Sequence, residues 1–175
     1  MTINFGDGTT IASGGSLGKV LQTISTVVQG TFSQTLNANT ESSSCGLDVT
    51  ITPSSSSNKV LVLVQATIGI RTDDHVGFVV LRNSSDINAY LPSSPGSRST
   101  FASGSSTRAN SYPVGISGCF LDSPSTTSST VYSARLKYGR GANDQDIYLN
   151  RAEVDNDSIS RQRSVSTITV MEIAG

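Results

Sequence analysis

Apolar and polar residues alternate over most of this chain, which is the period-two pattern of β-strands. The clearest case is residues 59–70, where Val62 and Val64 belong to one face of the predicted strand. Leu61 and Leu63 belong to the other face, so the start of this segment is apolar on both sides. Because β-branched side chains suit a pleated surface, the pattern predicts a strand over residues 59–70.

Other short segments share this character: they are rich in Val, Ile, Tyr and Phe, and Gly, Ser, Asn, Asp or Pro bound them. They cover residues 46–52, 75–82, 114–121, 130–138, 146–150 and 165–173. Short strands joined by turn-rich loops predict an all-β fold, an antiparallel β-sandwich or jelly-roll-like domain. The polar tract from Pro53 to Asn58 predicts a turn, and the simplest arrangement is a hairpin of the two strands that flank it.

Residues 17–28 fit two kinds of element. Leu17 and Ile24 belong to an apolar stripe with helical spacing, and Ser16 stands where a helix cap would be. Residues 20–28, however, are mostly β-branched, which lowers helix propensity and suits a strand. We favour the strand; as a helix, the same stripe would suit a short three-stranded coiled coil.

The chain divides into an N-terminal arm, residues 1–30, for docking or trimerisation, and a single β-sandwich domain, residues 31–175. No internal repeat of fixed period is evident. Residues 92–111 and 122–130 are rich in small polar residues and are predicted to be loops.

The longer of these loops supplies the candidate contact residues. It contains Arg98 and Arg108, and Tyr112 follows directly after it. The simpler interpretation is a solvated excursion of the chain. Because long loops often carry function, the alternative is that these three side chains contribute to an exposed contact surface.

Charge and composition exclude several classes of protein. The 175 residues include 12 Lys and Arg against 13 Asp and Glu, for a net charge of −1. Without a basic stripe, nucleic-acid binding is disfavoured. No apolar run approaches the roughly 18 residues of a membrane span, so no membrane insertion is expected. Residues 1–8 lack the features of a signal peptide, which predicts folding in a cytoplasm and reduced thiols at Cys45 and Cys119.

The chain offers little for catalysis. His75 is the single histidine, and it follows Asp73 and Asp74. Neighbouring residues on a strand point to opposite faces, so an Asp–His pair beside a serine is not expected here. We therefore predict no catalytic residues and no enzyme activity.

Metal and cofactor sites are not expected either. Cys45 and Cys119 lack the paired spacing of zinc ligands. Residues 144–146 and 155–157 contain paired aspartates, but neither stretch continues into the Gly and distal Glu of a calcium loop. Exposed turns are the simpler interpretation of both.

The composition also favours self-association. Hydrophobic residues make up 35% of the chain and charged residues only 14%, which predicts a thin core and a surface rich in hydroxyl groups. Such a domain gains stability by burying strand faces against copies of itself. The sequence therefore predicts a symmetric oligomer.

Several stretches resemble small virion structural proteins of tailed phages, especially phages of marine bacteria and cyanobacteria. They are Ile3-Asn-Phe5, Gly8-Thr-Thr10, Leu17-Gly-Lys-Val-Leu-Gln22, Thr31-Phe-Ser33, Val49-Thr-Ile-Thr-Pro-Ser-Ser-Ser-Ser-Asn-Lys-Val-Leu-Val62, Phe120-Leu-Asp-Ser-Pro124 and Ser166-Thr-Ile-Thr-Val-Met-Glu-Ile173. The resemblance implies a non-enzymatic homotrimer in the virion, assembled in the host cytoplasm together with other virion proteins. It further implies exposure as a short tail fibre, spike or fibre tip that contacts a host glycan or protein.

Three alternatives stay open. A capsid decoration protein or a head fibre would fit the same resemblance. A free carbohydrate-binding β-sandwich ranks lower, because the chain has no Trp and only five Tyr to form a sugar platform. An ordinary cellular β domain with an unrecognised ligand is the third.

Overall fold

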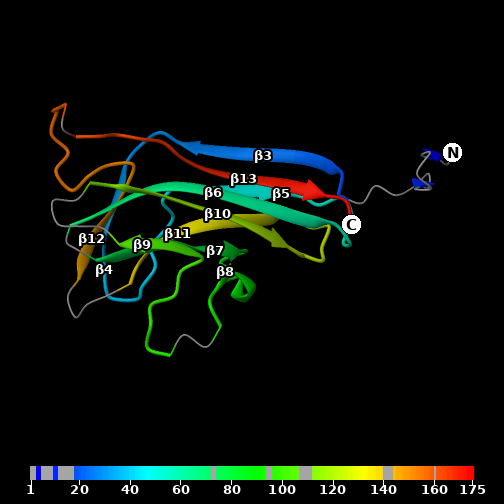
Figure 1. The fold of residues 1–175 in the computed structure, drawn as a ribbon, viewed down its shortest axis with the longest axis horizontal. Coiled ribbons are helices and arrows are strands. Elements are labelled where there is room, and N and C mark those ends of the chain that lie inside the picture. The colour runs from blue at the N-terminus through cyan, green and yellow to red at the C-terminus, as the bar shows by residue number, and fades with distance from the viewer. Residues whose placement is uncertain are drawn as a thin grey trace.

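The computed structural model describes residues 3–4, 10–11, 18–71, 74–93, 96–106, 112–139, 144–159 and 161–175. Two antiparallel sheets face each other as a sandwich, which confirms the all-β prediction (Figure 1). A separate two-stranded piece pairs β1 (Ile3–Asn4) with β2 (Thr10–Ile11).

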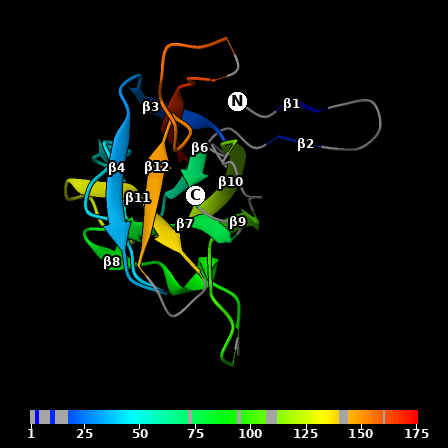
Figure 2. The same cartoon turned by 90° about the vertical axis from the view of Figure 1, so that its left-hand side faces the viewer.

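The β6 sheet is built around the longest strand of the described chain. Its members are β3 (Val20–Val28), β4 (Phe32–Leu36), β6 (Lys59–Ile70), β10 (Val114–Asp122), β12 (Gln145–Leu149) and β13 (Ser166–Ile173). One edge of β6 pairs with β12 and then β13, and the other edge pairs with β10. In turn, β4 pairs with β12, and β3 with β13. β3 and β4 thus lie end to end as one long strand interrupted by a loop, and so do β12 and β13 (Figure 2); these two interrupted strands are here called columns.

The Asn150 side chain forms hydrogen bonds that connect the gap between β3 and β4 with the gap between β12 and β13. It is fully buried, with a positive φ of 62° that Asn tolerates better than most residues. Its Nδ2 donates to the carbonyl oxygens of Val28 at 2.7 Å and Gly30 at 2.9 Å, at the gap between β3 and β4. Its Oδ1 accepts a 2.6 Å hydrogen bond from the Ser166 hydroxyl, where β13 begins. The Asn150 amide therefore satisfies two backbone carbonyl groups at the gap between β3 and β4, and it also binds the first residue of β13.

The β7 sheet forms the second layer. Its members are β5 (Asp48–Ile51), β7 (His75–Arg82), β8 (Ser85–Asp86), β9 (Ser103–Ser106) and β11 (Thr130–Tyr138). β11 lies between β5 and β7, while β9 and β8 share the other edge of β7. A short 3-10 helix, η1 (Asn88–Tyr90), follows β8. None of the helical segments in the described part of the chain has the length and apolar character needed to span a bilayer.

Successive strands cross repeatedly between the layers, as in a jelly roll. The order is β3/β4, β12/β13, β6, β10 in one sheet and β5, β11, β7, β9/β8 in the other. The predicted hairpin of residues 46–52 with 59–70 is therefore wrong. β5 pairs with β11, and β6 pairs with β13 and β10, so the turn between them carries the chain from one sheet to the other. A turn-forming sequence reverses the chain but does not specify which edge the next strand joins.

The core is one continuous apolar layer between the sheets. It includes Val60, Val62, Val64, Phe78, Val80, Tyr132, Leu136, Ile168 and Val170, all buried. These positions alternate along their strands because successive side chains of a strand point to opposite faces. The apolar residues left exposed lie either on the outside of the sheets, as Leu121 and Val131 do, or in loops, as Val154 and Ile159 do.

Residues 17–28 were predicted as strand in preference to helix, and β3 confirms the strand over residues 20–28; residue 17 lies outside the described residues. Of the N-terminal arm predicted over residues 1–30, the stretch from Val20 to Val28 thus belongs to the sandwich as a sheet strand. For residues 1–17, only the backbone of β1 and β2 is described. The tract 92–111, predicted to be a loop, contains β9, whose Ser-Gly-Ser-Ser sequence has no apolar pattern of its own.

Candidate interaction surfaces

The outward-facing side chains of β3, β13, β6 and β10 form a continuous surface, here called the β6 outer face. It consists of Val20, Thr23, Ser25, Val27, Lys59, Leu61, Leu63, Gln65, Ser117, Cys119, Leu121, Thr167, Thr169, Met171 and Ile173. Strand register arranges them in rows: Ser25, Thr169, Leu63 and Cys119 form one row, and Thr23, Met171, Leu61 and Leu121 the next. The surface is apolar in the middle and rich in hydroxyl groups toward β3.

The apolar part of this face is open to solvent. The Leu121 side chain is 57% exposed, while Leu61, Leu63 and Met171 are half-buried among their neighbours. A shallow hollow of about 460 Å³ lies over the middle of the face, lined in part by Leu63 and Cys119. Of the residues in the face, Lys59 is the charged one, and its ammonium donates to the Ser123 hydroxyl.

The outer face of the β7 sheet is different, because it carries paired charges. Arg135 donates to the Asp48 carboxylate at 2.8 Å, and Lys137 lies 3.7 Å from Glu41. Burial opposes ionisation of Asp48, but hydrogen bonds from Ser133, Ser44 and Arg135 lower its pKa below the ordinary value. These charges are paired and partly buried, whereas the β6 outer face leaves apolar surface in contact with water.

The size of the β6 outer face suits a protein contact. Four strands about 4.8 Å apart, with outward side chains about 6.8 Å apart along each, give a face on the order of 500 Å². Two such faces in contact remove about 1,000 Å² from water, which is where specific interfaces begin. Depletion of charge is also typical of an interface core.

The sequence pattern predicted only some of the residues of the β6 outer face. The pattern of residues 59–70 indicated apolar residues on both sides, and the outward ones are Leu61 and Leu63. Met171 and Leu121 were missed as partners of these residues, because only the pairing of β13 and β10 with β6 brings them into the same rows.

The predicted contact residues lie in different settings. Arg98 lines a cavity at the end of the sandwich where β7 begins. Tyr112 is 62% exposed just before β10 and is not among the residues that line this cavity. Arg108 lies outside the described residues.

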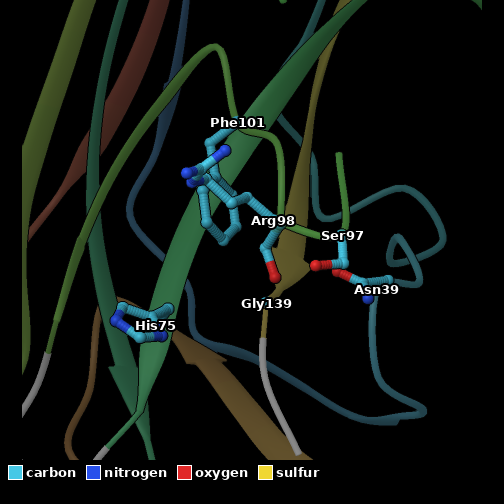
Figure 3. A pocket seen from close by; sticks show the side chains of 7 residues that line it. Asn39, His75, Ser97, Arg98, Phe101 and Gly139 are labelled. Carbon is cyan, nitrogen blue, oxygen red and sulfur yellow. The ribbon is translucent and has the colours of Figure 1, made fainter. Parts of the chain in front are cut away.

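The cavity beside Arg98, here called the Phe101 cavity, has a volume of about 480 Å³ and is open on one side. It is lined by Asn39, His75, Ser97, Arg98, Ser99, Phe101 and Gly139. Arg98 and Phe101 overlap in the view of Figure 3, with His75 below them and the side chains of Ser97 and Asn39 on the other side of the cavity. Sequence reasoning selected Arg98 but not Asn39 or His75, which come from other parts of the chain.

The Phe101 ring lies on a base of three glycines. Gly77 of β7 and Gly104 of β9 are paired in register, and Gly139 follows β11. A Cβ at Gly77 would lie 2.6 Å from the ring, a Cβ at Gly104 would lie 2.9 Å from it, and one at Gly139 would overlap it. The ring thus packs on the backbone of three neighbouring strands, as aromatic side chains do when they cover glycines in sheets.

Three of the acidic groups considered from sequence, Asp74, Asp146 and Asp155, have protein partners. Asp74 is buried and accepts hydrogen bonds from the Tyr138 hydroxyl at 3.0 Å and the His75 backbone at 2.8 Å. Asp155 accepts both hydrogen bonds of the Arg163 guanidinium at 2.6 Å, and Asp146 accepts one from Thr35 at 2.6 Å. Within the described ranges, no three His, Cys, Asp or Glu side chains are grouped so that they could hold a metal ion.

Comparison with known proteins adds no relative. The chain matches no family model, and a search of curated proteins finds no significant match. The function is therefore inferred from the two surfaces and from the sequence resemblance described above.

Proposed function

We propose that this protein is a non-enzymatic structural component of a tailed-phage virion, a homotrimer exposed on the particle as a short tail fibre, spike or fibre tip. Its activity is self-association. Copies of the chain join through apolar surface, and the loops that lie away from this contact are exposed to the host. The alternative position is the capsid surface, where the same trimer would act as a decoration protein or head fibre.

The observation that carries this proposal is the β6 outer face. Leu61, Leu63, Met171 and Leu121 lie side by side on the outside of a sheet whose inner face is already fully packed. Complete burial of an exposed Leu side chain contributes about 1.5–3 kcal/mol. Leu121 is 57% exposed and the other three are half-buried, so a neighbouring copy gains part of this amount at each of the four. A symmetric homo-oligomer is the usual way for such a surface to be covered.

The sequence resemblance supports the virion role and the trimer. Its two most specific stretches, residues 49–62 and 166–173, are joined by hydrogen bonds from Asn58 and Ser54 to Glu172. The resemblance therefore extends over connected segments that include the first four residues of β6 and the whole of β13. Those are the central strands of the β6 outer face.

Self-association is tested with Leu63→Glu, which puts a carboxylate in the middle of the face. We expect the wild-type chain to show three times its 18.2 kDa mass in light scattering after size exclusion, and the variant to weaken association by at least about 100-fold. Val131→Glu is the matched control, because Val131 is 37% exposed on the β7 sheet and faces away from β6. Circular dichroism verifies that both variants fold. A wild-type monomer at micromolar concentration, or a Leu63→Glu trimer, would overturn the assembly.

The virion role is tested on particles of the phage that encodes the chain. Gold-labelled antibodies against the purified protein should label intact particles. Label at the tail end supports the fibre or spike, and label over the head supports the decoration alternative. Particles that carry no label, beside labelled protein in the soluble lysate, would refute a virion component.

A further inference from the structure

The 151–165 loop, which connects β12 to β13, supplies a second contact surface for assembly. We propose that Ile159 of this loop inserts into the hollow of the β6 outer face of a neighbouring copy, so that the chains of the trimer join head to tail. This inference rests on the proposed function, because it specifies how the proposed trimer closes.

The apolar side chains of this loop lie in contact with water. The loop projects at the end of the sandwich away from the C-terminus (Figure 1). Ile159 is fully exposed, and Val154 and Val165 are 46% and 48% exposed. Val27, which is 55% exposed, lies beside the first residues of β13 at the same end. Apolar surface gathered in this way is typical of a protein contact.

Hydrogen bonds hold the loop in shape. Asp155 accepts both hydrogen bonds of the Arg163 guanidinium, each at 2.6 Å, and the backbone of Arg163 pairs with that of Arg151 to close the base of the loop. The N–H of Arg161 donates to the Ser158 carbonyl oxygen at 2.9 Å, which forms a turn whose second residue is the exposed isoleucine. Pre-organisation of this kind reduces the entropy that binding costs.

The hollow follows from small side chains on β10. Ser117 and Cys119 lie in register beside the larger Gln65 and Leu63 of β6, so the surface is lower over β10. The hollow has a volume of about 460 Å³, which leaves room for a branched aliphatic side chain. The described residues that line it carry no charge, so an apolar side chain can enter without taking an ion out of water.

The two surfaces decide the symmetry of the contact. The loop and the hollow are different parts of the chain, so a copy that offers its loop to one neighbour can accept the loop of another. Such contacts form a ring when the rotation between copies closes, and three copies make the proposed trimer. Two β6 outer faces packed directly on each other would instead be related by a two-fold axis and give a dimer. The loop therefore replaces the second face in the trimer contact.

Cross-linking tests this contact, because Cys119 is an exposed thiol that lines the hollow. In Ile159→Cys, copper phenanthroline as oxidant should take one electron and one proton from each of two thiols and join the new thiol to Cys119 of the partner subunit as a disulfide. Three such bonds close one ring, so non-reducing gel electrophoresis should show a ladder that ends at the trimer. Peptide mass mapping should identify the link. Val131→Cys, on the outside of the β7 sheet, is the matched control and should remain monomeric in the gel.

Light scattering before oxidation separates this inference from the proposed function. A wild-type monomer would refute both. A trimer of Ile159→Cys that forms no link to Cys119, or a link between two Cys119 thiols in the wild type, would overturn the head-to-tail contact and leave the trimer standing. A ladder that continues past the trimer would show an open chain of copies and would refute closure.

A second variant measures the contribution of the isoleucine without any cross-link. Ile159→Glu should weaken association at least about tenfold, because a carboxylate would have to leave water to enter the hollow. Ile159 is fully exposed, so this change leaves the fold intact, and circular dichroism verifies it. Val131→Glu should associate like the wild type. Equal association of Ile159→Glu and wild type would overturn the inference.

Discussion

The Asn58 side-chain amide donates a 2.6 Å hydrogen bond to the Glu172 carboxylate, across 114 residues of sequence. Glu172 is only 1% exposed. The same carboxylate accepts hydrogen bonds from the Ser54 N–H at 2.6 Å, the Ser54 hydroxyl at 2.8 Å and the Gln22 amide at 2.6 Å. One buried charge therefore ties the turn before β6 and the outer strand β3 to the C-terminal strand β13.

We predict that Glu172→Gln lowers the free energy of unfolding by about 2–4 kcal/mol, because an amide N–H₂ would face donors that now share a carboxylate. Urea unfolding followed by circular dichroism, at one fixed protein concentration, measures the change. Asp157→Asn is the control, since Asp157 is exposed, and should alter stability by less than about 0.5 kcal/mol. Equal unfolding midpoints for Glu172→Gln and wild type would contradict the role of the buried charge.

The same residue predicts loss of stability in acid. Burial alone would raise the pKa of Glu172, but the hydrogen bonds from Asn58, Gln22 and Ser54 lower it to about 2 from an ordinary 4.5. The unfolded chain then takes up the proton first, so this stabilisation is complete above about pH 4.5 and is lost as the pH falls toward 2. The full shift corresponds to about 3 kcal/mol.

The measurement compares the free energy of unfolding at about pH 6 and about pH 3. Wild type should lose about 2 kcal/mol more than Glu172→Gln over this interval. The lowered pKa of Asp48 acts in the same direction in both proteins and cancels in the comparison. Parallel losses in the two proteins would exclude Glu172 as the source.

Because the Phe101 ring packs on Gly139, we predict that mutations at these two residues have coupled effects on stability. Gly139→Ala should destabilise the protein by about 1–3 kcal/mol, because the new methyl group overlaps the Phe101 ring. In a Phe101→Ala background most of this added cost should disappear, a coupling of about 1–2 kcal/mol in a double-mutant cycle. Gly115→Ala is the control, since no atom lies within 4 Å of a Cβ there, and it should be nearly neutral. Additive effects would show that the ring does not occupy this space.

The two thiols should differ in reactivity. Cys119 is exposed on the β6 outer face, whereas Cys45 is 4% exposed and its Sγ lies 3.5 Å from the Ala134 carbonyl oxygen. Burial raises the pKa of the Cys45 thiol, which further lowers its reactivity. Maleimide labelling followed by intact mass should modify Cys119 in the folded protein and Cys45 only after unfolding.

This labelling also reports on assembly. If copies cover the β6 outer face, the rate at Cys119 should fall as the protein concentration rises through the range where the oligomer forms. A constant rate across that range would place the contact between copies elsewhere on the molecule.

The local pattern was sufficient for most strands. Residues 59–70, 75–82 and 130–138 were predicted as strands with the bounds that β6, β7 and β11 have. Alternation and β-branching act within a few residues, so they can be read without knowledge of the partner strand. β9 could not be found this way, because its four small residues are a strand only through pairing with β7.

The surfaces were harder to predict than the strands. Arg98 was selected as a contact residue and does line a cavity, but the cavity needs Asn39 and His75, which lie far from Arg98 in sequence. The apolar character of Leu61 and Leu63 was visible in the pattern. Whether that side of the strand is covered or exposed depends on which layer packs against the sheet.

By itself, the sequence determined the all-β class and the positions of the long strands, because side-chain alternation is a property of neighbouring residues. The tertiary structure alone decided which sheet each strand joins, where the columns break and which apolar face remains uncovered. Those features depend on partners such as Asn58 with Glu172 and Asn150 with Val28, which are 114 and 122 residues apart. Contacts at such separations form only when the whole chain folds.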